Sequence, residues 1–257
     1  NNTVGSRSVA IGASALFTQN PTTATNMYNV AVGDDAGKLI TTGERNTLLG
    51  KNAGDAITTG GYNSVMGQNA GTAITEGVRN VCIGDRSGVN ITTGGDNIMI
   101  GANNSASAAD ANNNIVMGFE VTGVGANNFT FGSTSTDSNI AFGATSITAP
   151  SDVRLKEDIQ DETVGLGFIN DLRPVTFQWK KEKDIPSDMN AHVAGSEKRT
   201  MNGKHNHGFI AQEVKAVIDN HNIKDGFDMW SEDETDGRQR VGDASLMPIM
   251  VKAVQEL

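Results

Sequence analysis

The sequence has little cysteine, few basic residues and no long apolar run, and each shortage excludes a class of protein. Its one cysteine, Cys82, cannot build an intrachain disulfide framework. No apolar run approaches the roughly 18 residues that a membrane-spanning helix needs, and the residues after Asn1 do not resemble a signal peptide. We therefore expect a chain that does not insert into a membrane.

Acidic residues outnumber basic ones, with 30 Asp and Glu against 20 Lys and Arg, a formal charge of −10 and a pI near 4.8. Nucleic acids and anionic membrane surfaces attract the opposite charge, so we expect neither as a partner. The acidity is interpreted as a source of solubility, with an acidic docking surface as the alternative.

The composition changes near residue 150. Residues 1–150 hold six of the 20 basic and ten of the 30 acidic residues, but 22 of the 30 glycines. Two different kinds of structure are therefore joined in one chain, and we expect domains at residues 1–150 and 151–257.

The first of these domains is a repeat with a period of 17 residues. Each unit has an asparagine followed four positions later by a glycine, and four units share a further glycine and an I-T-x-G stretch. The asparagines are Asn29, Asn46, Asn63, Asn80, Asn97 and Asn114, and the glycines are Gly33, Gly50, Gly67, Gly84, Gly101 and Gly118. Units this short cannot bury their own apolar residues, so they must stack on one another.

The three residues between each asparagine and glycine are mostly apolar, as in Val81-Cys82-Ile83. Because neighbouring side chains of a strand point to opposite faces, the pattern predicts short parallel strands that are buried on both faces. One face would line the inside of a coil and the other would need a partner, and Cys82 is expected to be a packed thiol. The glycines would supply positive φ at corners, and the asparagines would bond their own backbone or stack in a ladder.

After Gly118 the spacing contracts, and Asn128–Gly132 and Asn139–Gly143 stand 11 residues apart with phenylalanine in their triplets. We interpret this end as a cap that seals the stack before the fold changes.

The repeat resembles the heads of trimeric autotransporter adhesins and the repeats of phage tail fibres, over roughly residues 3–143 and on motifs such as Ser8-Val9-Ala10-Ile11-Gly12. The resemblance implies an all-β trimeric repeat in which each of three chains forms a roll of short parallel strands. Units of those families are usually shorter, so the I-T-x-G stretch would be an added loop or hairpin.

Residues 151–257 read as an α+β domain. Leu166, Ile169 and Leu172 fit a short helix, and Val175, Phe177 and Trp179 alternate as a strand does. Residues 208–214 lead into a second helix that ends near Ile218. At the C-terminus Leu246, Met250, Ala253 and Leu257 are spaced 4, 3 and 4 apart, which is typical of a coiled-coil seam.

Three blocks in this half are similar to the endosialidase-type intramolecular chaperones of phage tail spikes and fibres, a family of serine autoproteases. They are S-D-x-R-L-K (151–156), L-R-P-V-x-F-x-W-K (172–180) and G-F-I-A-Q-E-V (208–214), and residues 246–257 resemble the terminal helix of the family. The stretch 241–245 departs from it, because the family commonly has a tyrosine there.

The resemblance implies a catalytic Ser–Lys dyad at Ser151 and Lys156 and a single cut between Pro150 and Ser151. Serine is a weak nucleophile unless a base takes its proton, and lysine can do so when burial or neighbouring cations lower its pKa. Arg154 is the candidate neighbouring cation, and Asp152 is a further supporting residue.

The resemblance also implies a homotrimer that belongs to a virion tail fibre and binds a host cell-surface receptor or glycan. Its chaperone domain would be made in the host cytoplasm and released after cleavage. The alternative is a trimeric adhesin or structural fibre that keeps this domain as a permanent clamp. A glycan-degrading fibre finds little support, because the repeats show no recurrent pair of acidic residues at a cleft.

We expect no metal and no cofactor. Of the four histidines only His205 and His207 are close in sequence, and they lie in a loop rich in Gly, Asn and Lys. Gly123-Val124-Gly125 is not followed by the helix of a nucleotide-binding loop, and residues 233–237 resemble a calcium loop only in composition. The other two histidines are His192 and His221.

Overall fold

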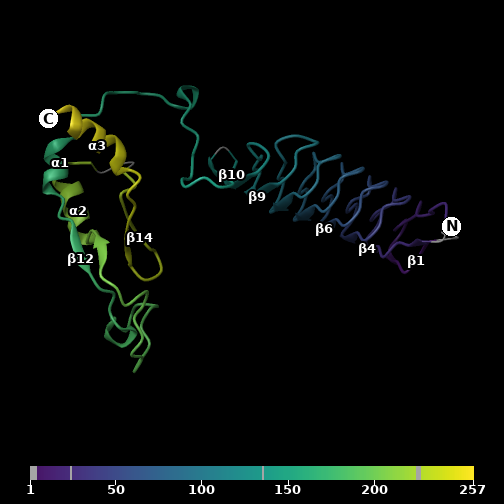
Figure 1. The fold of residues 1–257 in the computed structure, drawn as a ribbon, viewed down its shortest axis with the longest axis horizontal. Coiled ribbons are helices and arrows are strands. Elements are labelled where there is room, and N and C mark those ends of the chain that lie inside the picture. The colour runs from purple at the N-terminus through teal and green to yellow at the C-terminus, as the bar shows by residue number, and fades with distance from the viewer. Residues whose placement is uncertain (1–4, 24, 135, 224–226) are drawn as a thin grey trace. The chain divides into compact units, whose positions relative to one another are not determined.

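The structure is a computed structural model that describes residues 5–23, 25–134, 136–223 and 227–257. The chain divides into two compact units, Asn1–Lys156 and Glu157–Leu257, each of which is described by itself (Figure 1). No helix among the described residues is long and apolar enough to cross a membrane.

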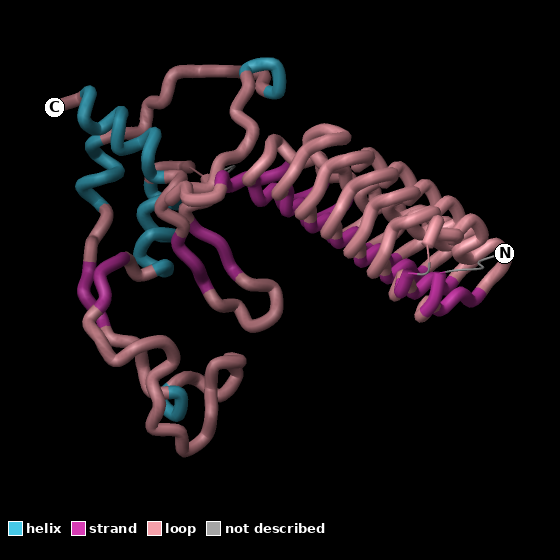
Figure 2. Tube along the Cα trace, turned by 45° about the vertical axis from the view of Figure 1, so that its right-hand side comes forward, coloured by secondary structure: helices cyan, strands magenta, loops and turns pink. Residues whose placement is uncertain are grey.

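The first unit is a β-solenoid. Its strands form one sheet in the order β11-β10-β9-β8-β7-β6-β5-β4-β2, and all neighbours except β10 and β11 are parallel. They are β2 (Val9–Ile11), β4 (Val30–Val32), β5 (Thr47–Leu49), β6 (Ser64–Met66), β7 (Val81–Ile83), β8 (Ile98–Ile100), β9 (Asn114–Phe119), β10 (Asn128–Ser133) and β11 (Thr136–Ala141). A smaller parallel pair, β1 (Gly5–Ser6) and β3 (Thr25–Asn26), lies in the first coils. From β4 to β9 each residue pairs with the residue 17 positions on, which confirms the predicted stack (Figure 2).

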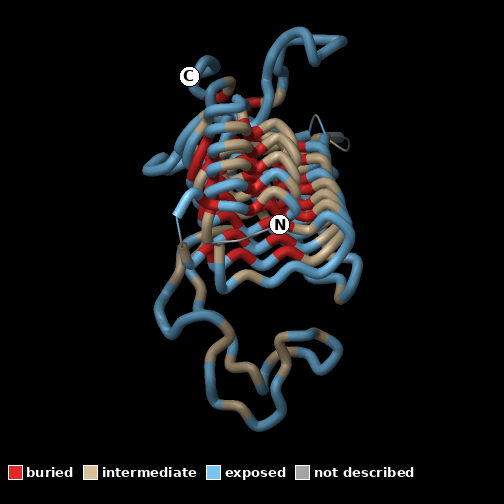
Figure 3. Tube along the Cα trace, turned by 90° about the vertical axis from the view of Figure 1, so that its right-hand side faces the viewer, coloured by how far each residue is buried: buried red, intermediate tan, exposed pale blue. Residues whose placement is uncertain are grey.

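Buried residues run along the inside of the coils in columns (Figure 3). Two columns of larger apolar residues form walls, and the small residues Ala36, Ala53 and Ala70 form a further buried column. One wall is the middle residue of each strand, and the other is the isoleucine of the I-T-x-G stretch. The buried residues are Ala31, Leu48, Val65, Cys82, Met99 and Val116 on the strands, and Ile40, Ile57, Ile74 and Ile91 opposite them. The expectation of an added loop or hairpin was therefore wrong, because this stretch closes each coil. Burial confirms Cys82 as a packed thiol and raises its pKa to about 12.

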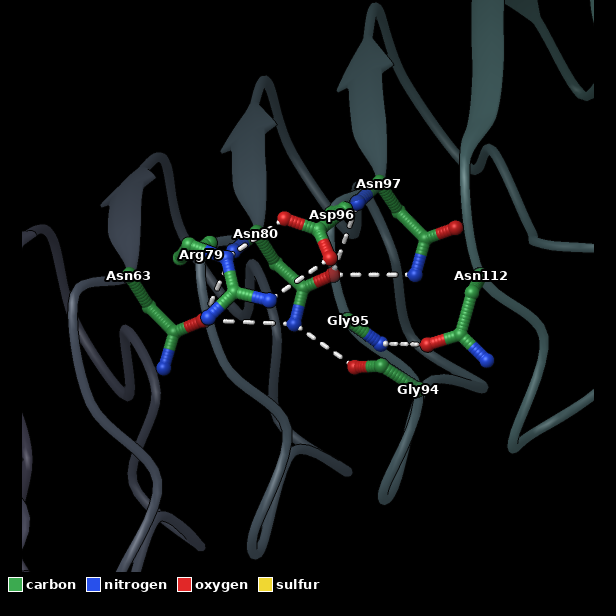
Figure 4. A network of polar contacts seen from close by, with 8 residues as sticks. All are labelled: Asn63, Arg79, Asn80, Gly94, Gly95, Asp96, Asn97 and Asn112. Atoms are coloured by element: carbon green, nitrogen blue, oxygen red, sulfur yellow. Dashed lines mark hydrogen bonds and ion pairs between the residues drawn. The ribbon is translucent and has the colours of Figure 1, made fainter. Parts of the chain in front are cut away.

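The repeated asparagines form a ladder inside the coils (Figure 4). The backbone N–H and the Nδ2 of Asn80 both donate to Oδ1 of Asn63, at 2.9 and 3.2 Å, and the same Nδ2 donates to the Gly94 carbonyl at 2.9 Å. Asn97 repeats this pattern on Asn80. Because a buried amide must find partners for its donors and its acceptor, the ladder joins each coil to the next by polar bonds.

Glycine follows each strand for two reasons. Gly67 has φ of +138°, which disfavours other residues, and a Cβ built on it would lie 2.4 Å from the carbonyl oxygen of Gly84 in the next coil. The coils can therefore stack closely only where glycine occupies this column.

The sequence predicted strands that are buried on both faces. Within the single chain only the face that points into the coil is buried. The first and third residues of the strands point away from the coil and stay partly or fully exposed. Leu49, Met66 and Ile83 form an apolar row that is 42, 47 and 38% exposed.

The residues after Gly118, which were predicted to cap the stack, do not form another complete parallel coil. β10 continues the parallel stack on β9, but β11 turns back and pairs with β10 in the antiparallel direction, with Phe129 opposite Ile140. Asn139–Gly143 is therefore the return strand of a hairpin and the residues just after it, and Phe142 is left exposed beyond the strand.

The second unit confirms the predicted α+β fold. Its core surrounds Phe168, which is fully buried and meets the rings of His221 and Phe227 edge-on. The predicted strand ends before Trp179. The elements are α1 (Leu166–Asp171), β12 (Val175–Phe177), η2 (Glu182–Asp184), β13 (Asn206–Gly208), α2 (Ala211–Asn220), β14 (Trp230–Glu232), β15 (Gln239–Val241) and α3 (Leu246–Gln255).

The terminal helix forms as predicted, but its predicted seam was wrong. Leu246 and Ala253 are buried within their own unit, where α3 packs on α1. The apolar residues of α3 that remain exposed are Met247, Met250, Val251 and Val254. A spacing pattern alone cannot tell which of two apolar faces packs inside the domain.

Replacing Gly67 by alanine tests the close stacking of the coils. The new Cβ would meet the backbone of the next coil, so we expect Gly67→Ala to lower the stability of the solenoid by more than about 4 kcal/mol or to prevent its folding. Gly143→Ala is the matched control, because Gly143 also has positive φ (+85°) but nothing within 4 Å of its added Cβ. It should cost about 1 to 2 kcal/mol in denaturant unfolding. Equal losses would contradict the stacking argument.

Asp55 gives a pH test. Burial raises its pKa, and its Oδ1 has no hydrogen-bond partner. A carboxyl group whose pKa is higher in the folded state than in the unfolded state adds stability at pH values below its unfolded-state pKa. This contribution is lost as the pH rises through its folded-state pKa. Asp55→Thr, which copies Thr72 of the next coil, should therefore raise the unfolding temperature at pH 7 and give less gain below about pH 3.5. A gain independent of pH would contradict this.

Candidate functional site

The predicted site residues lie at the end of the first unit, around a single turn of 3₁₀ helix, η1 (Val153–Leu155). The turn is closed by backbone bonds from Leu155 to Asp152 and from Lys156 to Val153, at 3.0 and 3.1 Å. This local fold brings two residues five positions apart into contact. Nζ of Lys156 donates to Oγ of Ser151 at 2.7 Å.

Asp152 and Arg154 form a second pair within the same turn. The Asp152 carboxylate accepts from the Arg154 backbone N–H at 2.9 Å and from the guanidinium at 2.6 to 3.1 Å. These bonds hold the pKa of Asp152 below its ordinary value. Asp152 therefore caps the turn and neutralises Arg154, the side chain that the sequence suggested as a cationic neighbour of Lys156.

The whole turn is exposed within the chain. Ser151 and Lys156 are exposed, and the apolar side chains Val153, Leu155 and Ile159 are each 66% exposed. The contact between hydroxyl and amine has the geometry for proton transfer. The described part of the chain does not bury Lys156, and it gives Arg154 a carboxylate partner.

The second and third sequence blocks meet in the second unit. β12 pairs with β13, with Val175 opposite Gly208, and Arg173 binds both carboxylate oxygens of Glu213 at 2.9 and 2.5 Å. This bond lowers the pKa of Glu213. The Arg173–Glu213 pair was not predicted, because the two residues are 40 positions apart in the sequence and meet only once β12 and β13 pair. A shallow hollow beside them is lined by Arg173–Phe177 and Ile210.

The long connection between β12 and β13 is held by charged side chains. Lys181 and Lys183 both donate to Glu197, which lowers the pKa of that carboxyl to about 2, and Ser196 donates to Glu182 at 2.6 Å. These contacts give the connection a defined fold of its own despite its exposure.

Three of the other polar candidates, His192, His221 and Asp233, have protein partners. Nδ1 of His192 lies 2.7 Å from the Ile185 carbonyl, and Nε2 of His221 lies 2.8 Å from the Asp171 carboxylate. Asp233 binds Arg238 and Arg240 in the β14–β15 hairpin. Over the residues that the structure describes, no three side chains are grouped as metal ligands.

Comparison with protein families gives one match. Residues 151–223 match the family described as chaperone of endosialidase, which is also named as a peptidase family. Residues 151–223 therefore resemble an endosialidase-type chaperone. The match begins at Ser151 and includes all three sequence blocks, and it covers less than half of the chain. No curated protein and no solved structure matches the chain.

Proposed function

We propose that residues 1–150 are a segment of a trimeric tail fibre and that the chaperone domain, residues 151–257, guides its assembly and then cuts itself away. The observation that carries this proposal is the contact of 2.7 Å between Lys156 Nζ and Ser151 Oγ at the first residue of the family match. The cut falls between Pro150 and Ser151.

The reaction needs only groups of this chain and water. A neutral Lys156 takes the proton of the Ser151 hydroxyl, and Oγ attacks the Pro150 carbonyl carbon. The Pro150–Ser151 amide bond breaks, the amide nitrogen takes the proton back from Lys156, and an ester forms between Pro150 and Ser151. Water then opens the ester, which releases the Pro150 carboxylate and restores the hydroxyl. Each chain is cut once.

Assembly would supply the burial that Lys156 lacks in the exposed η1 turn. A lysine acts as a base more readily when burial disfavours its charged form, and Lys156 is exposed in the chain. Val153 and Leu155 flank it with apolar surface that packing against other chains would cover. Cleavage would therefore wait until three chains have come together.

The apolar row of Leu49, Met66 and Ile83 supports the trimer. These side chains stand on one face of a regular parallel sheet, where their exposure to water is unfavourable and contact with a second and third copy removes it. The exposed face of α3, residues 247–254, offers a second apolar surface for the same contact.

A helper domain suits this kind of fibre. Strands that pair only with distant residues or with other chains form slowly and aggregate easily. A C-terminal trimer raises the effective concentration of the repeats, and its later removal makes the fibre persist kinetically. We place the mature fibre on a virion, where it binds a host cell-surface receptor or glycan, and the synthesis of the chaperone domain in the host cytoplasm.

The exposure of the Ser151–Lys156 turn also favours a second candidate, a fibre that keeps the chaperone domain as a permanent clamp. A denaturing gel of the assembled protein distinguishes the two, because the clamp leaves one chain and cleavage leaves two.

Ser151→Ala should give an assembled but uncut trimer, because the attacking oxygen is gone while the backbone is unchanged. Lys156→Ala should slow cleavage at least about 1000-fold, since the hydroxyl is no longer activated. Ser187→Ala and Lys204→Ala, which change exposed residues of the β12–β13 connection, are the controls and should cut normally. Mass spectrometry of the released fragment should find Ser151 at its N-terminus. Full cleavage of Ser151→Ala, or another new terminus, would refute the dyad.

Met66→Lys should weaken the trimer, because it places three charges in the apolar row that the copies share. Light scattering should then show monomers or aggregates in place of a trimer. Gln68→Lys adds the same charge two residues away at an exposed position outside the strand and should leave the mass unchanged. A trimer that tolerates both substitutions equally would rule out this face as the interface.

A further inference from the structure

A second column runs beside the asparagine ladder. It is formed by the residue directly before each ladder asparagine and, in the first coil, by the residue before Ser8, whose Oγ accepts from the Asn29 backbone N–H at 3.3 Å. In five successive coils this residue is Arg7, Tyr28, Arg45, Tyr62 and Arg79. The sequence has two tyrosines in all, and both are in this column. The Arg45 guanidinium lies 5.8 Å from the Tyr28 ring centre and 5.1 Å from that of Tyr62, and Arg7 lies 5.7 Å from Tyr28. We call these five residues the Arg–Tyr ladder.

The fold alone does not call for these residues. All five have φ between +54° and +61°, a conformation that asparagine and aspartate adopt far more readily than arginine or tyrosine. The next two coils show the preferred choice, with Asp96 (φ +60°) and Asn113 (φ +56°) in the same column. Arginine and tyrosine therefore occupy this column at a conformational cost that the backbone does not require.

The ladder carries cations that are available to a ligand. Among the described residues neither Arg7 nor Arg45 forms an ion pair with a carboxylate, and each donates one N–H to a tyrosine hydroxyl, of Tyr28 and Tyr62. Tyr28 and Tyr62 are 40 and 47% exposed. Arg79 differs, because two of its guanidinium nitrogens donate to the Asp96 carboxylate, at 2.6 and 2.8 Å (Figure 4).

The spacing of the cations is regular. Arg7, Arg45 and Arg79 occupy every second coil, and strands of a sheet stand about 4.8 Å apart, so the guanidinium groups repeat at roughly 10 Å along the stack. A row one residue wide with this repeat fits a linear polymer of regular charge better than a folded partner.

We propose that the Arg–Tyr ladder binds an extended polysaccharide that carries carboxylates, with its chain along the coils. Guanidinium groups bind carboxylates through paired hydrogen bonds, and tyrosine offers a hydroxyl and an apolar ring to the sugars. The proposed fibre segment, residues 1–150, has six basic and ten acidic residues and so a formal charge of −4, which disfavours densely charged polyphosphates and leaves a sparsely charged carboxylated polymer as the ligand class. This proposal names a ligand class for host attachment and rests on the proposed fibre function.

Calorimetry on the assembled protein tests the ladder, with hyaluronate oligosaccharides as the probe, because they carry a carboxylate on every second sugar. Dextran of equal length is the neutral control. Hyaluronate should bind and dextran should not, and Arg45→Gln should weaken binding about tenfold or more. Lys51→Gln removes one charge from another column of the same coils and should change the affinity far less.

Asp96→Asn separates binding from a purely structural role. Asparagine occupies this column at Asn113, so the backbone tolerates it, and the change releases Arg79 for the ligand. Hyaluronate should then bind severalfold more tightly, whereas a ladder that served only stability would show a lower unfolding temperature and no gain in binding.

Three binding results would overturn the proposal. They are no binding of hyaluronate, equal loss of affinity in Lys51→Gln and Arg45→Gln, and competition by duplex DNA as strong as competition by hyaluronate. A change of trimer mass in Arg45→Gln would show that the ladder is a contact between chains and would also overturn it. Autocleavage and trimer mass of the unchanged protein test the fibre function separately, so their failure is distinguishable from loss of glycan binding.

Discussion

The stacking of 17-residue coils in strict register is the constraint on which the rest of the structure depends. This register is maintained by the asparagine ladder from Asn29 to Asn114, which gives the buried amides hydrogen-bond partners in the next coil. It also depends on glycines such as Gly67, which stand where the next coil leaves no room for a Cβ. Once register is set, each position of the repeat becomes a column. The buried isoleucine wall, the apolar row outside the strands and the Arg–Tyr ladder are all consequences of this single regularity.

The same regularity explains why we propose a helper domain for assembly. Parallel coils gain their bonds only when neighbours are already in place, and the apolar row is exposed within the single chain. In the sequence the proposed chaperone domain follows the repeats directly. The Ser151–Lys156 contact lies in the η1 turn, where both residues are exposed. Assembly and cleavage are therefore coupled in the proposed mechanism through one requirement, the covering of exposed apolar surface.

Much of the fold could be predicted from the sequence because a period fixes which residues are equivalent. The sequence could not show that Ile40 and its equivalents form the second wall of the coil. Nor could it show that β11 runs antiparallel to β10, because both features depend on packing across the coil. The seam of α3 was misassigned because α1 covers one of its two apolar faces. In the site, resemblance pointed to Ser151 and Lys156, but their contact depends on the η1 turn and on Asp152 as its cap. The Arg173–Glu213 pair joins residues 40 positions apart and needed the strand pairing to appear.

The central claim is that the repeats reach their assembled state only with the chaperone domain attached. The most direct measurement compares the full chain with a chain that ends at Pro150, both made under the same conditions, by size-exclusion chromatography with light scattering. The account predicts a soluble trimer of residues 1–150 from the full chain and aggregates from the shortened one. A shortened chain that yields the same soluble trimer unaided would contradict it.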